Sequence, residues 1–256
     1  MVNPKIVMIT QARVGSSRLP SKVLLDLNGV SLLEFHLRRL KQAKRADELL
    51  VATTHEEGVE QIIDIAKGID VSYYQGSTDD VLDRFYQAAK ASKADIVLRL
   101  TSDCPLIDPQ LVDDVIAFML DGKFDYCANI LKEEFPDGQD IEVMTFDALE
   151  KAWTEATLKS DREHVTPYIR RNSSFLNGTL FKSDNFKAPA NMNHIRMTID
   201  EKNDLESMVT LIKEVGANES WMSYATYLIE HPEKFSNQLI TRNEGYQKSL
   251  EKDKNN

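Results

Sequence analysis

One segment decides the fold class of this chain: Ile6-Val-Met-Ile-Thr10, followed by Gln11-Ala-Arg-Val-Gly-Ser-Ser-Arg-Leu-Pro-Ser-Lys22. The first five residues are a short apolar run, which predicts a buried strand. The stretch from Gln11 to Lys22 is long and mostly polar, which predicts a loop. A loop directly after a buried strand lies at the carboxyl edge of the sheet, where open α/β folds bind ligands.

This loop carries the residue types that bind a polyphosphate. Glycine lets the backbone approach a ligand, and backbone N–H groups of a turn can cradle phosphate oxygens. Arginine offers a planar fork to phosphate, and lysine offers a compact charge. The residues concerned are Arg13, Gly15, Ser16, Ser17, Arg18 and Lys22. The alternative is a solvated basic turn. The loop contains neither G-x-x-x-x-G-K-[ST] nor G-x-G-x-x-G, which disfavours a P-loop NTPase and a nicotinamide or flavin site.

The rest of the first half alternates short apolar runs with amphipathic segments. This alternation predicts an α/β fold with a mostly parallel sheet and crossover helices. Further strands are expected at Leu49–Thr53, Val71–Tyr74 and Ile96–Leu100. Helices are expected from Ser31 to Leu40, over Val59–Ala66, from Asp79 or Asp80 to Ala91, and from Pro109 to Gly122.

The second half is less regular. Strands are expected at Tyr126–Asn129, Ile141–Thr145, Phe175–Leu180 and Ile195–Ile199. Helices are expected at Asp147–Ala156, Asp161–Arg170 (with Pro167 bending or ending it), Asp204–Val215 and Tyr224–Glu230. We expect one domain over residues 1–236, with 1–125 forming most of the nucleotide site and 126–236 supplying acceptor and dimer contacts. Residues 237–256 are expected to be a polar tail, either frayed or an interaction arm.

Composition narrows the function classes. The chain has 256 residues, a net charge of −10 and 42% hydrophobic residues, which is typical of a globular protein and disfavours nucleic-acid binding. Two cysteines, Cys104 and Cys127, are too few for a disulfide framework and are expected to be reduced and buried. No run approaches the ~20 apolar residues of a membrane helix, so a cytoplasmic protein without membrane insertion is expected.

Several ordered motifs resemble one enzyme family. The loop pattern Ala-Arg-x-Gly-Ser-x-Arg-Leu-Pro-x-Lys is similar to the N-terminal signature of sugar cytidylyltransferases, which include the CMP-Kdo and CMP-sialic acid synthetases. The best resemblance is to the spore-coat polysaccharide cytidylyltransferase family, and it extends from Lys5 to about Leu205. Supporting segments are Gly76-Ser-Thr-Asp-Asp-Val-Leu-Asp-Arg84, Asp103-Cys-Pro-Leu-Ile-Asp108, Asp161-Arg-Glu-His-Val-Thr-Pro167 and Arg196-Met-Thr-Ile-Asp200.

The resemblance implies a Rossmann-like fold of the nucleotide-diphospho-sugar transferase type, with a mixed, mostly parallel sheet and flanking helices. It also implies Mg²⁺ held by Asp103 and Asp200. Both aspartates follow expected strands, so both are expected at the ligand-binding edge. Mg²⁺ at a triphosphate needs only one or two carboxylates because it keeps several waters. The alternative is that each aspartate caps the loop or helix that follows it.

The turn after Gly76 is implied to line the base pocket. Ser77, Asp79 and Asp80 are candidates to face cytosine or ribose, together with backbone groups of Ala12 and Gly76. The simpler account of the aspartates is helix capping and surface charge. Some related enzymes place an arginine near this turn, where this chain has Asp79.

An acceptor pocket is expected in the irregular half. Its candidate residues are Asp140, Glu142, Arg162 and His164, which suit acceptor hydroxyls or a carboxylate. Asp161 is equally well explained as a plain N-cap, and Arg162 with Glu163 as a surface pair.

The expected reaction is attack of an acceptor oxygen on the α-phosphorus of CTP, with release of pyrophosphate. Arg13, Arg18 and Lys22 are the expected catalytic cations. A 2-keto-3-deoxy sugar acid is the favoured acceptor, by analogy. The alternatives are a glycosyltransferase, although the chain has no D-x-D motif, a sugar-1-phosphate nucleotidylyltransferase, and a non-catalytic nucleotide-binding protein. The resemblance also implies a homodimer, to which Phe175, Leu176, Leu180 and Phe181 could contribute apolar surface, a core role being equally expected.

Overall fold

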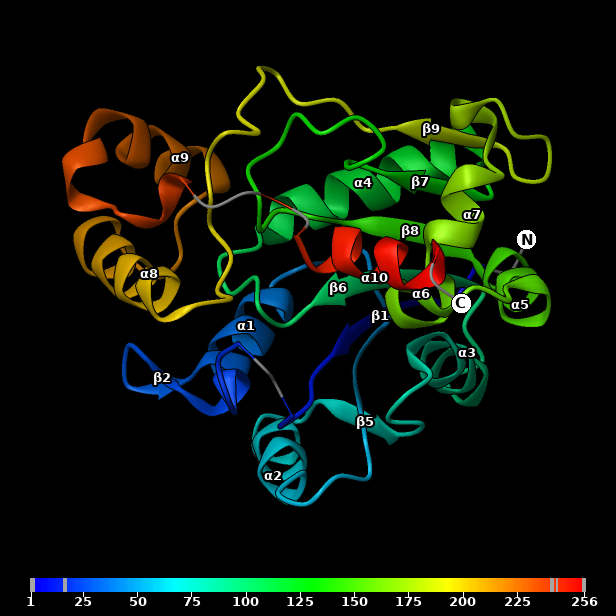
Figure 1. Cartoon of the computed structure of the whole chain (residues 1–256), viewed down its shortest axis with the longest axis horizontal. Coiled ribbons are helices and arrows are strands. Elements are labelled where there is room, and N and C mark those ends of the chain that lie inside the picture. Colours follow the sequence, from blue (N-terminus) through cyan, green and yellow to red (C-terminus); the bar gives the residue numbers. More distant parts are fainter. Residues whose placement is uncertain (1–2, 16–17, 240–241, 243, 255–256) are drawn as a thin grey trace.

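A seven-stranded mixed sheet organises the protein, whose computed structural model describes residues 3–15, 18–239, 242 and 244–254. The strand order is β5-β4-β1-β6-β8-β7-β9 (Figure 1). The first four are β5 (Ser72–Gln75), β4 (Glu48–Thr53), β1 (Ile6–Gln11) and β6 (Ile96–Thr101), all parallel. The others are β8 (Glu142–Thr145), antiparallel to both neighbours, β7 (Tyr126–Ala128) and β9 (Ser183–Asn185), parallel to β7. The predicted mixed, mostly parallel α/β fold is confirmed.

Strand β1 is central because both of its faces are apolar. Val7 and Ile9 are fully buried on one face, and Ile6 and Met8 are buried on the other. Such a two-sided apolar run suits an interior strand of a parallel sheet. Its registers pair Ile9 with Leu50 of β4 and with Arg99 of β6.

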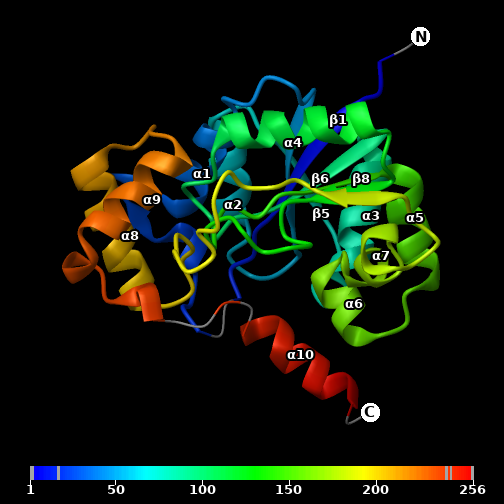
Figure 2. The ribbon, with the colours of Figure 1, turned by 90° about the horizontal axis from the view of Figure 1, so that it is seen from above.

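Helices cover both faces of the sheet. One face carries α1 (Leu32–Leu40), α2 (Glu60–Gly68) and α4 (Pro109–Gly122), and the other carries α3 (Val81–Ala91) and α5 (Phe146–Glu155) (Figure 2). Their starts follow local chemistry. The Ser31 hydroxyl accepts a hydrogen bond from the Glu34 N–H at 3.1 Å, Asp80 caps α3, and Pro109 stands in the first turn of α4.

The predictions of strands at Phe175–Leu180 and Ile195–Ile199 are wrong. Ser174–Leu176 forms a 3₁₀ turn (η2), and the strand of this region is β9, seven residues further on. Ile195–Ile199 forms only an isolated bridge, between Arg196 and Asp137. The Met197 N–H donates to the Asp137 carbonyl, and the Ile199 N–H donates to the Asp103 carbonyl. A strand requires a neighbour at its edge, and apolar pattern alone does not show whether one is present.

The helix expected over Asp161–Arg170 is two helices. α6 spans Lys159–His164 and α7 spans Pro167–Arg171. Val165 between them has a φ of 70°, and Pro167 begins the second helix. Asp161 lies inside α6 and binds Arg171 through both carboxylate oxygens, so the N-cap interpretation is wrong.

The remaining helices lie at the C-terminal end. They are α8 (Lys202–Val215), α9 (Trp221–Glu230) and α10 (Glu244–Lys254), with short 3₁₀ turns η3 (Pro232–Lys234) and η4 (Asn237–Leu239). The other short elements are η1 (Lys22–Leu24), β2 (Asp26–Leu27) and β3 (Val30–Ser31). The polar tail thus contains a helix, α10, which lies against α6 through bonds from Ser160 to Asp253 and between His164 and Ser249 (Figures 1 and 2).

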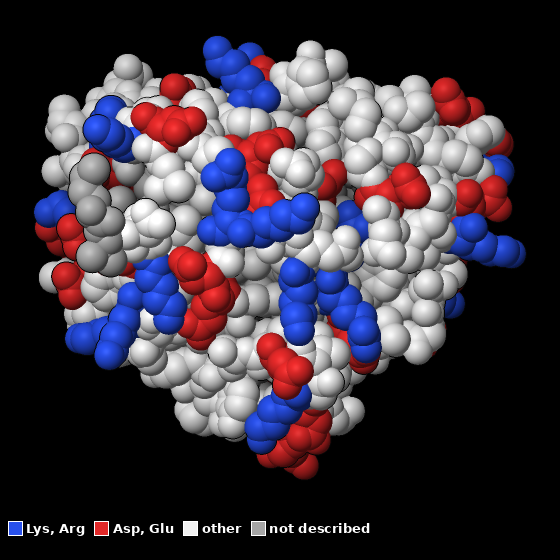
Figure 3. Space-filling model, turned by 180° about the vertical axis from the view of Figure 1, so that it is seen from behind, with Lys and Arg blue, Asp and Glu red and all other residues white. Residues whose placement is uncertain are grey.

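The cysteines and the charged surface residues lie where the sequence predicts them. Cys104 and Cys127 are both free and buried. Acidic and basic side chains are interspersed over the face shown in Figure 3. None of the helices in the described ranges combines the length and apolar character needed to cross a membrane.

Candidate active site

The predicted ligand edge is built from the loops after β1 and β6. The Ser102 hydroxyl donates to the Gln11 carbonyl at 2.7 Å, which ties the two loops together. The Ala12 N–H donates to the Ala52 carbonyl at 3.2 Å, so the loop leaves the sheet beside β4. These backbone contacts hold the cationic loop over the carboxyl ends of three parallel strands.

Lys22 brings the two predicted metal ligands together. Its ammonium group donates to Asp103 at 2.8 Å, to Asp200 at 3.0 Å and to the Ile199 carbonyl at 2.9 Å. Asp103 follows β6, and Asp200 precedes α8, so residues far apart in the chain converge on one point. The Ile199 N–H also donates to the Asp103 carbonyl at 2.9 Å, which joins the two aspartate segments directly.

The electrostatics of the Lys22–Asp103 pair favour the charged forms of both groups. Burial would lower the pKa of Lys22, but the adjacent Asp103 and Asp200 raise it above its ordinary value. Burial would likewise raise the pKa of Asp103, but the Lys22 ammonium lowers it well below its ordinary value. The site therefore holds an ionised Asp103 carboxylate against the Lys22 ammonium, with the Asp200 carboxylate bonded to the same cation.

The two carboxylates also fit a divalent metal. They already converge on a positive charge, and oxygen donors are what Mg²⁺ prefers. Within the described ranges, no three histidine, cysteine or carboxylate side chains gather into a metal cage. A metal at Asp103 and Asp200 would therefore complete its shell with water and nucleotide phosphate oxygens.

The other loop cations occupy the rim. Arg18 is exposed and donates to Asp200 at 2.8 Å. Arg13 is exposed and has no ion-pair or hydrogen-bond partner among the described residues. A Cβ on Gly15 would lie 2.9 Å from a Glu56 carboxylate oxygen, so a side chain there would displace Glu56. The predicted Ser16 and Ser17 lie outside the described residues.

The turn after β5 adjoins the same edge. The Gly76 N–H donates to the Thr53 carbonyl at 3.0 Å, and a Cβ on Gly76 would lie 3.0 Å from both the Tyr74 ring and the Arg84 side chain. The Ser77 hydroxyl accepts from the Asp80 N–H at 3.0 Å. Asp79 is exposed.

Asp80 joins two predicted subsites. One oxygen caps α3 by accepting from the Asp83 N–H at 2.9 Å, and the other accepts two bonds from Arg162, at 2.9 and 2.6 Å. The capping interpretation of Asp80 is confirmed. The proposed Arg162–Glu163 surface pair is wrong, because the Arg162 guanidinium reaches from α6 to Asp80 instead.

The other predicted acceptor residues all have partners in the protein. Asp140 accepts from Arg242 at 2.5 Å, and burial raises its pKa. Glu142 is 1% exposed and binds Arg99 at 2.7 Å and the Tyr126 hydroxyl. Burial would raise the pKa of Glu142, but Arg99 and Arg170 lower it.

His164 and Asp140 both contact the C-terminal segment. The His164 Nε2 lies 3.0 Å from the Ser249 hydroxyl, and its ring meets Tyr246 edge to face. Burial lowers the pKa of His164, with Arg99 adding to the effect. An acceptor binding at these residues would meet α10 and Arg242, which the sequence pattern did not predict.

Arg196 was also missed as a site residue. It is 5% exposed and binds Asp204 through two bonds of 2.8 and 2.9 Å, Asp137 at 2.8 Å and Asp200 at 3.4 Å. Arg196 therefore contacts the Oδ2 atom of Asp200, while Lys22 contacts its Oδ1 atom. The sequence signal that could have identified Arg196 is the segment Arg196-Met-Thr-Ile-Asp200, in which only Asp200 is predicted to bind a ligand.

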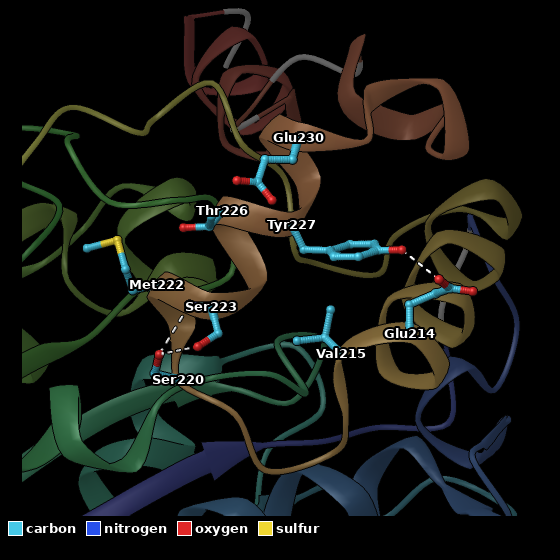
Figure 4. Close-up of a pocket in the computed structure, with 8 residues that line it drawn as sticks. All are labelled: Glu214, Val215, Ser220, Met222, Ser223, Thr226, Tyr227 and Glu230. Carbon is cyan, nitrogen blue, oxygen red and sulfur yellow. Dashed lines mark hydrogen bonds between the residues drawn. The ribbon is translucent and has the colours of Figure 1, made fainter.

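A separate surface cavity of about 470 Å³ lies between α8 and α9 (Figure 4). Its lining includes Tyr227, whose hydroxyl donates to Glu214 at 2.6 Å, and Ser220, which lies 2.9 Å from Ser223. None of the predicted site residues lines this cavity. The sheet edge, where Lys22, Asp103 and Asp200 meet, is therefore the candidate active site.

The fold, together with a cationic loop and two converging carboxylates, defines a nucleotidyltransferase. The chain belongs to the cytidylyltransferase family, whose model matches residues 7–235. It is a CTP-dependent enzyme that carries out cytidylyl transfer. The recognition made from the motifs is thereby confirmed.

Three similar proteins illustrate this relationship. Spore coat polysaccharide biosynthesis protein SpsF of Bacillus subtilis is 32% identical over 254 residues, covering 92% of each chain. A 3-deoxy-manno-octulosonate cytidylyltransferase of Chloroherpeton thalassium is 30% identical over 139 residues, covering 54% of this chain and 55% of the relative. The solved structure of a cytidylyltransferase from Leptospira borgpetersenii is 32% identical, with a TM-score of 0.86, and covers 94% of this chain and 100% of that one.

Proposed function

We propose that this enzyme transfers CMP from CTP to a sugar-type acceptor, with a 2-keto-3-deoxy sugar acid favoured, for surface polysaccharide or glycoconjugate biosynthesis. The observation that carries the proposal is the convergence of Lys22, Asp103 and Asp200 at the carboxyl edge of the sheet. The names of the spore-coat and 3-deoxy-manno-octulosonate relatives support the acceptor class. The two free cysteines are consistent with reaction in the cytoplasm.

The proposed reaction is a substitution at phosphorus. An acceptor hydroxyl oxygen bonds to the α-phosphorus of CTP, the bond from that phosphorus to the bridging oxygen breaks, and pyrophosphate leaves while the hydroxyl proton is released. Arg13, Arg18 and Lys22 hold the triphosphate and stabilise the charge on the departing pyrophosphate. Lys22 is the strongest candidate because it can exchange its aspartate partners for phosphate oxygens without leaving the site.

Mg²⁺ is the proposed cofactor, held by Asp103 and Asp200. The bound ion would neutralise phosphate charge and lower the pKa of the acceptor hydroxyl. Arg196 keeps Asp200 in place, and the backbone bond from Ile199 keeps the Asp103 segment beside it. The protein therefore contributes a preorganised pair of carboxylates.

Nucleotide contacts are proposed for backbone and side-chain groups on both sides of the edge. The residues are Ala12, Gly15, Ser16, Ser17, Gly76, Ser77, Asp79 and Asp80. The acceptor contacts proposed are Asp140, Glu142, Arg162 and His164. Glu142 is enclosed, whereas Asp140, Arg162 and His164 are half-buried. An acceptor would have to share or displace their present partners, which are Arg242, Asp80 and Ser249 respectively.

A homodimer is also proposed. Leu176 and Leu180 are 44% and 45% exposed, which supports an apolar contact there. Phe181 is only 4% exposed and packs against Tyr168, so it belongs to the core.

The test is pyrophosphate release from CTP and Mg²⁺ with a panel of acceptors. The panel contains 2-keto-3-deoxy sugar acids, sugar 1-phosphates and neutral sugars. We expect release with a sugar acid, and loss of at least ~10²-fold in turnover for Lys22→Ala. Lys213→Ala, an exposed lysine on α8, is the matched control and should retain activity. Pyrophosphate release with a sugar 1-phosphate alone would show that the acceptor is a sugar phosphate and not a sugar acid. A fully active Lys22→Ala would contradict the proposed role of Lys22 in binding the triphosphate.

A further inference from the structure

Arg84 is a buried cation without an ion pair. It lies on α3, is 1% exposed, and is among the largest fully buried side chains. Its Nη1 donates to the Ser77 carbonyl, while its Nε has no hydrogen-bond partner. No carboxylate of the described residues lies within ion-pair distance of its guanidinium, and neither the family motifs nor the predicted site assign it a role.

Such a group is costly to bury. An unpaired charge transferred from water into a protein interior loses favourable solvation that no partner replaces. Burial and the nearby Arg13 lower the pKa of Arg84 to about 10, while Glu56 and Asp80 only partly oppose this. The Asp80 carboxylate is already engaged by Arg162, so its compensation of Arg84 is weakened.

The aliphatic part and the charged end of this side chain make different contacts. The aliphatic part of Arg84 packs beside Gly76, close enough that a Cβ on the glycine would lie 3.0 Å from the Arg84 Cγ. A neutral unbranched side chain could supply the same packing. Ser77 is half-buried, so water could replace the guanidinium at its carbonyl.

The charge is placed where the nucleotide is expected. Ser77 follows β5, Arg13 follows β1, and both loops leave the carboxyl edge of the sheet on either side of β4. Arg13 is near enough to lower the pKa of Arg84, so two cations, one buried and one exposed without a described partner, lie close to each other at this edge. An anion or a strong oxygen acceptor between these loops would offset both charges.

We propose that Arg84 is a further CTP-binding residue, which donates to an oxygen of the nucleotide, either a phosphate oxygen or the cytosine O2, while fixing the base-side turn through the Ser77 carbonyl. The bound nucleotide supplies the partner that the protein itself lacks. This inference rests on the use of CTP and is independent of the acceptor.

The test measures binding and stability in the same variants. Arg84→Met keeps the unbranched shape and removes the charge, and Arg84→Gln also keeps a donor for the Ser77 carbonyl. We expect both to weaken CTP binding, measured by calorimetry with Mg²⁺, at least tenfold, which corresponds to about 1.4 kcal/mol. The melting temperature without ligand should stay level or rise in Arg84→Met, because a buried unpaired charge is gone. Arg38→Met, an exposed arginine paired with Glu34 on α1, is the matched control and should bind CTP normally.

Cytidine and CMP identify the oxygen concerned. Equal weakening for cytidine, CMP and CTP would assign Arg84 to the cytosine carbonyl. Weakening for CMP and CTP alone would assign it to phosphate. Unchanged CTP affinity in a folded neutral variant would overturn the proposal. Failure of both neutral variants to fold would overturn it as well, since the fold itself would then require the charge. If the wild type binds CTP but does not use a sugar acid, the proposed acceptor is wrong, and the proposed role of Arg84 in binding CTP is unaffected.

Discussion

His36 couples the stability of the active-site edge to pH. Its ring is fully buried, with Nε2 at 3.0 Å from the Thr10 hydroxyl and Nδ1 at 3.0 Å from the Cys104 carbonyl. Because a carbonyl can only accept, Nδ1 carries the proton and Nε2 accepts from Thr10. One neutral imidazole therefore joins α1, β1 and the turn that carries Asp103.

The magnitude follows from the pKa of His36, which burial lowers from 6.5 to about 4 against the opposing effects of the Cys104 carbonyl and Asp103. Between these values the unfolded chain binds the proton and the folded protein does not. The contribution of neutral His36 to the free energy of unfolding is therefore fully present above pH 6.5, and it is lost as the pH falls from 6.5 toward 4. The difference in pKa corresponds to about 3 kcal/mol of unfolding free energy.

Urea unfolding followed by tryptophan fluorescence measures this contribution. Between pH 7.5 and 4.5, the wild type should lose about 2 to 3 kcal/mol more than His36→Gln, which cannot titrate. His55→Gln, which removes an exposed histidine, is the control and should keep the wild-type slope. Parallel pH curves for the wild type and His36→Gln would refute the reasoning.

Four further predictions concern the proposed site and assembly. Asp103→Asn should fold, as judged by circular dichroism, but lose at least ~10²-fold of its Mg²⁺-dependent pyrophosphate release; full activity would exclude Asp103 as a metal ligand. CTP should exceed UTP by at least ~10²-fold in kcat/KM, because uracil presents an acceptor where cytosine presents a donor; comparable values would show that the base is not read at that edge. Ending the chain at residue 240 should raise the KM for the acceptor and leave the KM for CTP unchanged, since the removed segment contacts Asp140 and His164; an unchanged acceptor KM would separate the tail from the acceptor site. Light scattering should give twice the 29.1 kDa of one chain, and a particle of 29.1 kDa would rule out the dimer.

Local chemistry made much of the first half predictable. The apolar run Ile6–Thr10 could be buried on both faces only inside a sheet, and it became β1. Ser31, Asp80 and Pro109 signal helix starts through their own side chains or ring, and helices begin beside them. These signals act within a few residues, so no knowledge of the fold is needed to use them.

The second half was less predictable because its strands depend on distant partners. Phe175–Leu180 has the apolar content of a strand, but the chain turns there in a short 3₁₀ helix. The pairing of β7 with β9 joins residues more than fifty positions apart. Apolar pattern measures the tendency to be buried and does not measure the presence of a neighbour.

The sequence by itself determined the class of the enzyme and predicted the sheet edge that forms the candidate site, because the strand, the cationic loop and the ordered acidic motifs can be recognised from the order of the residues alone. Only the tertiary structure decided which side chains are partners: Lys22 lies between Asp103 and Asp200, Arg162 binds Asp80, and Arg84 has no ion-paired carboxylate among the described residues. The physical reason is range. Hydrogen bonds and ion pairs act over a few ångströms, and which side chains come that close is set by the packing of the whole sheet and its helices.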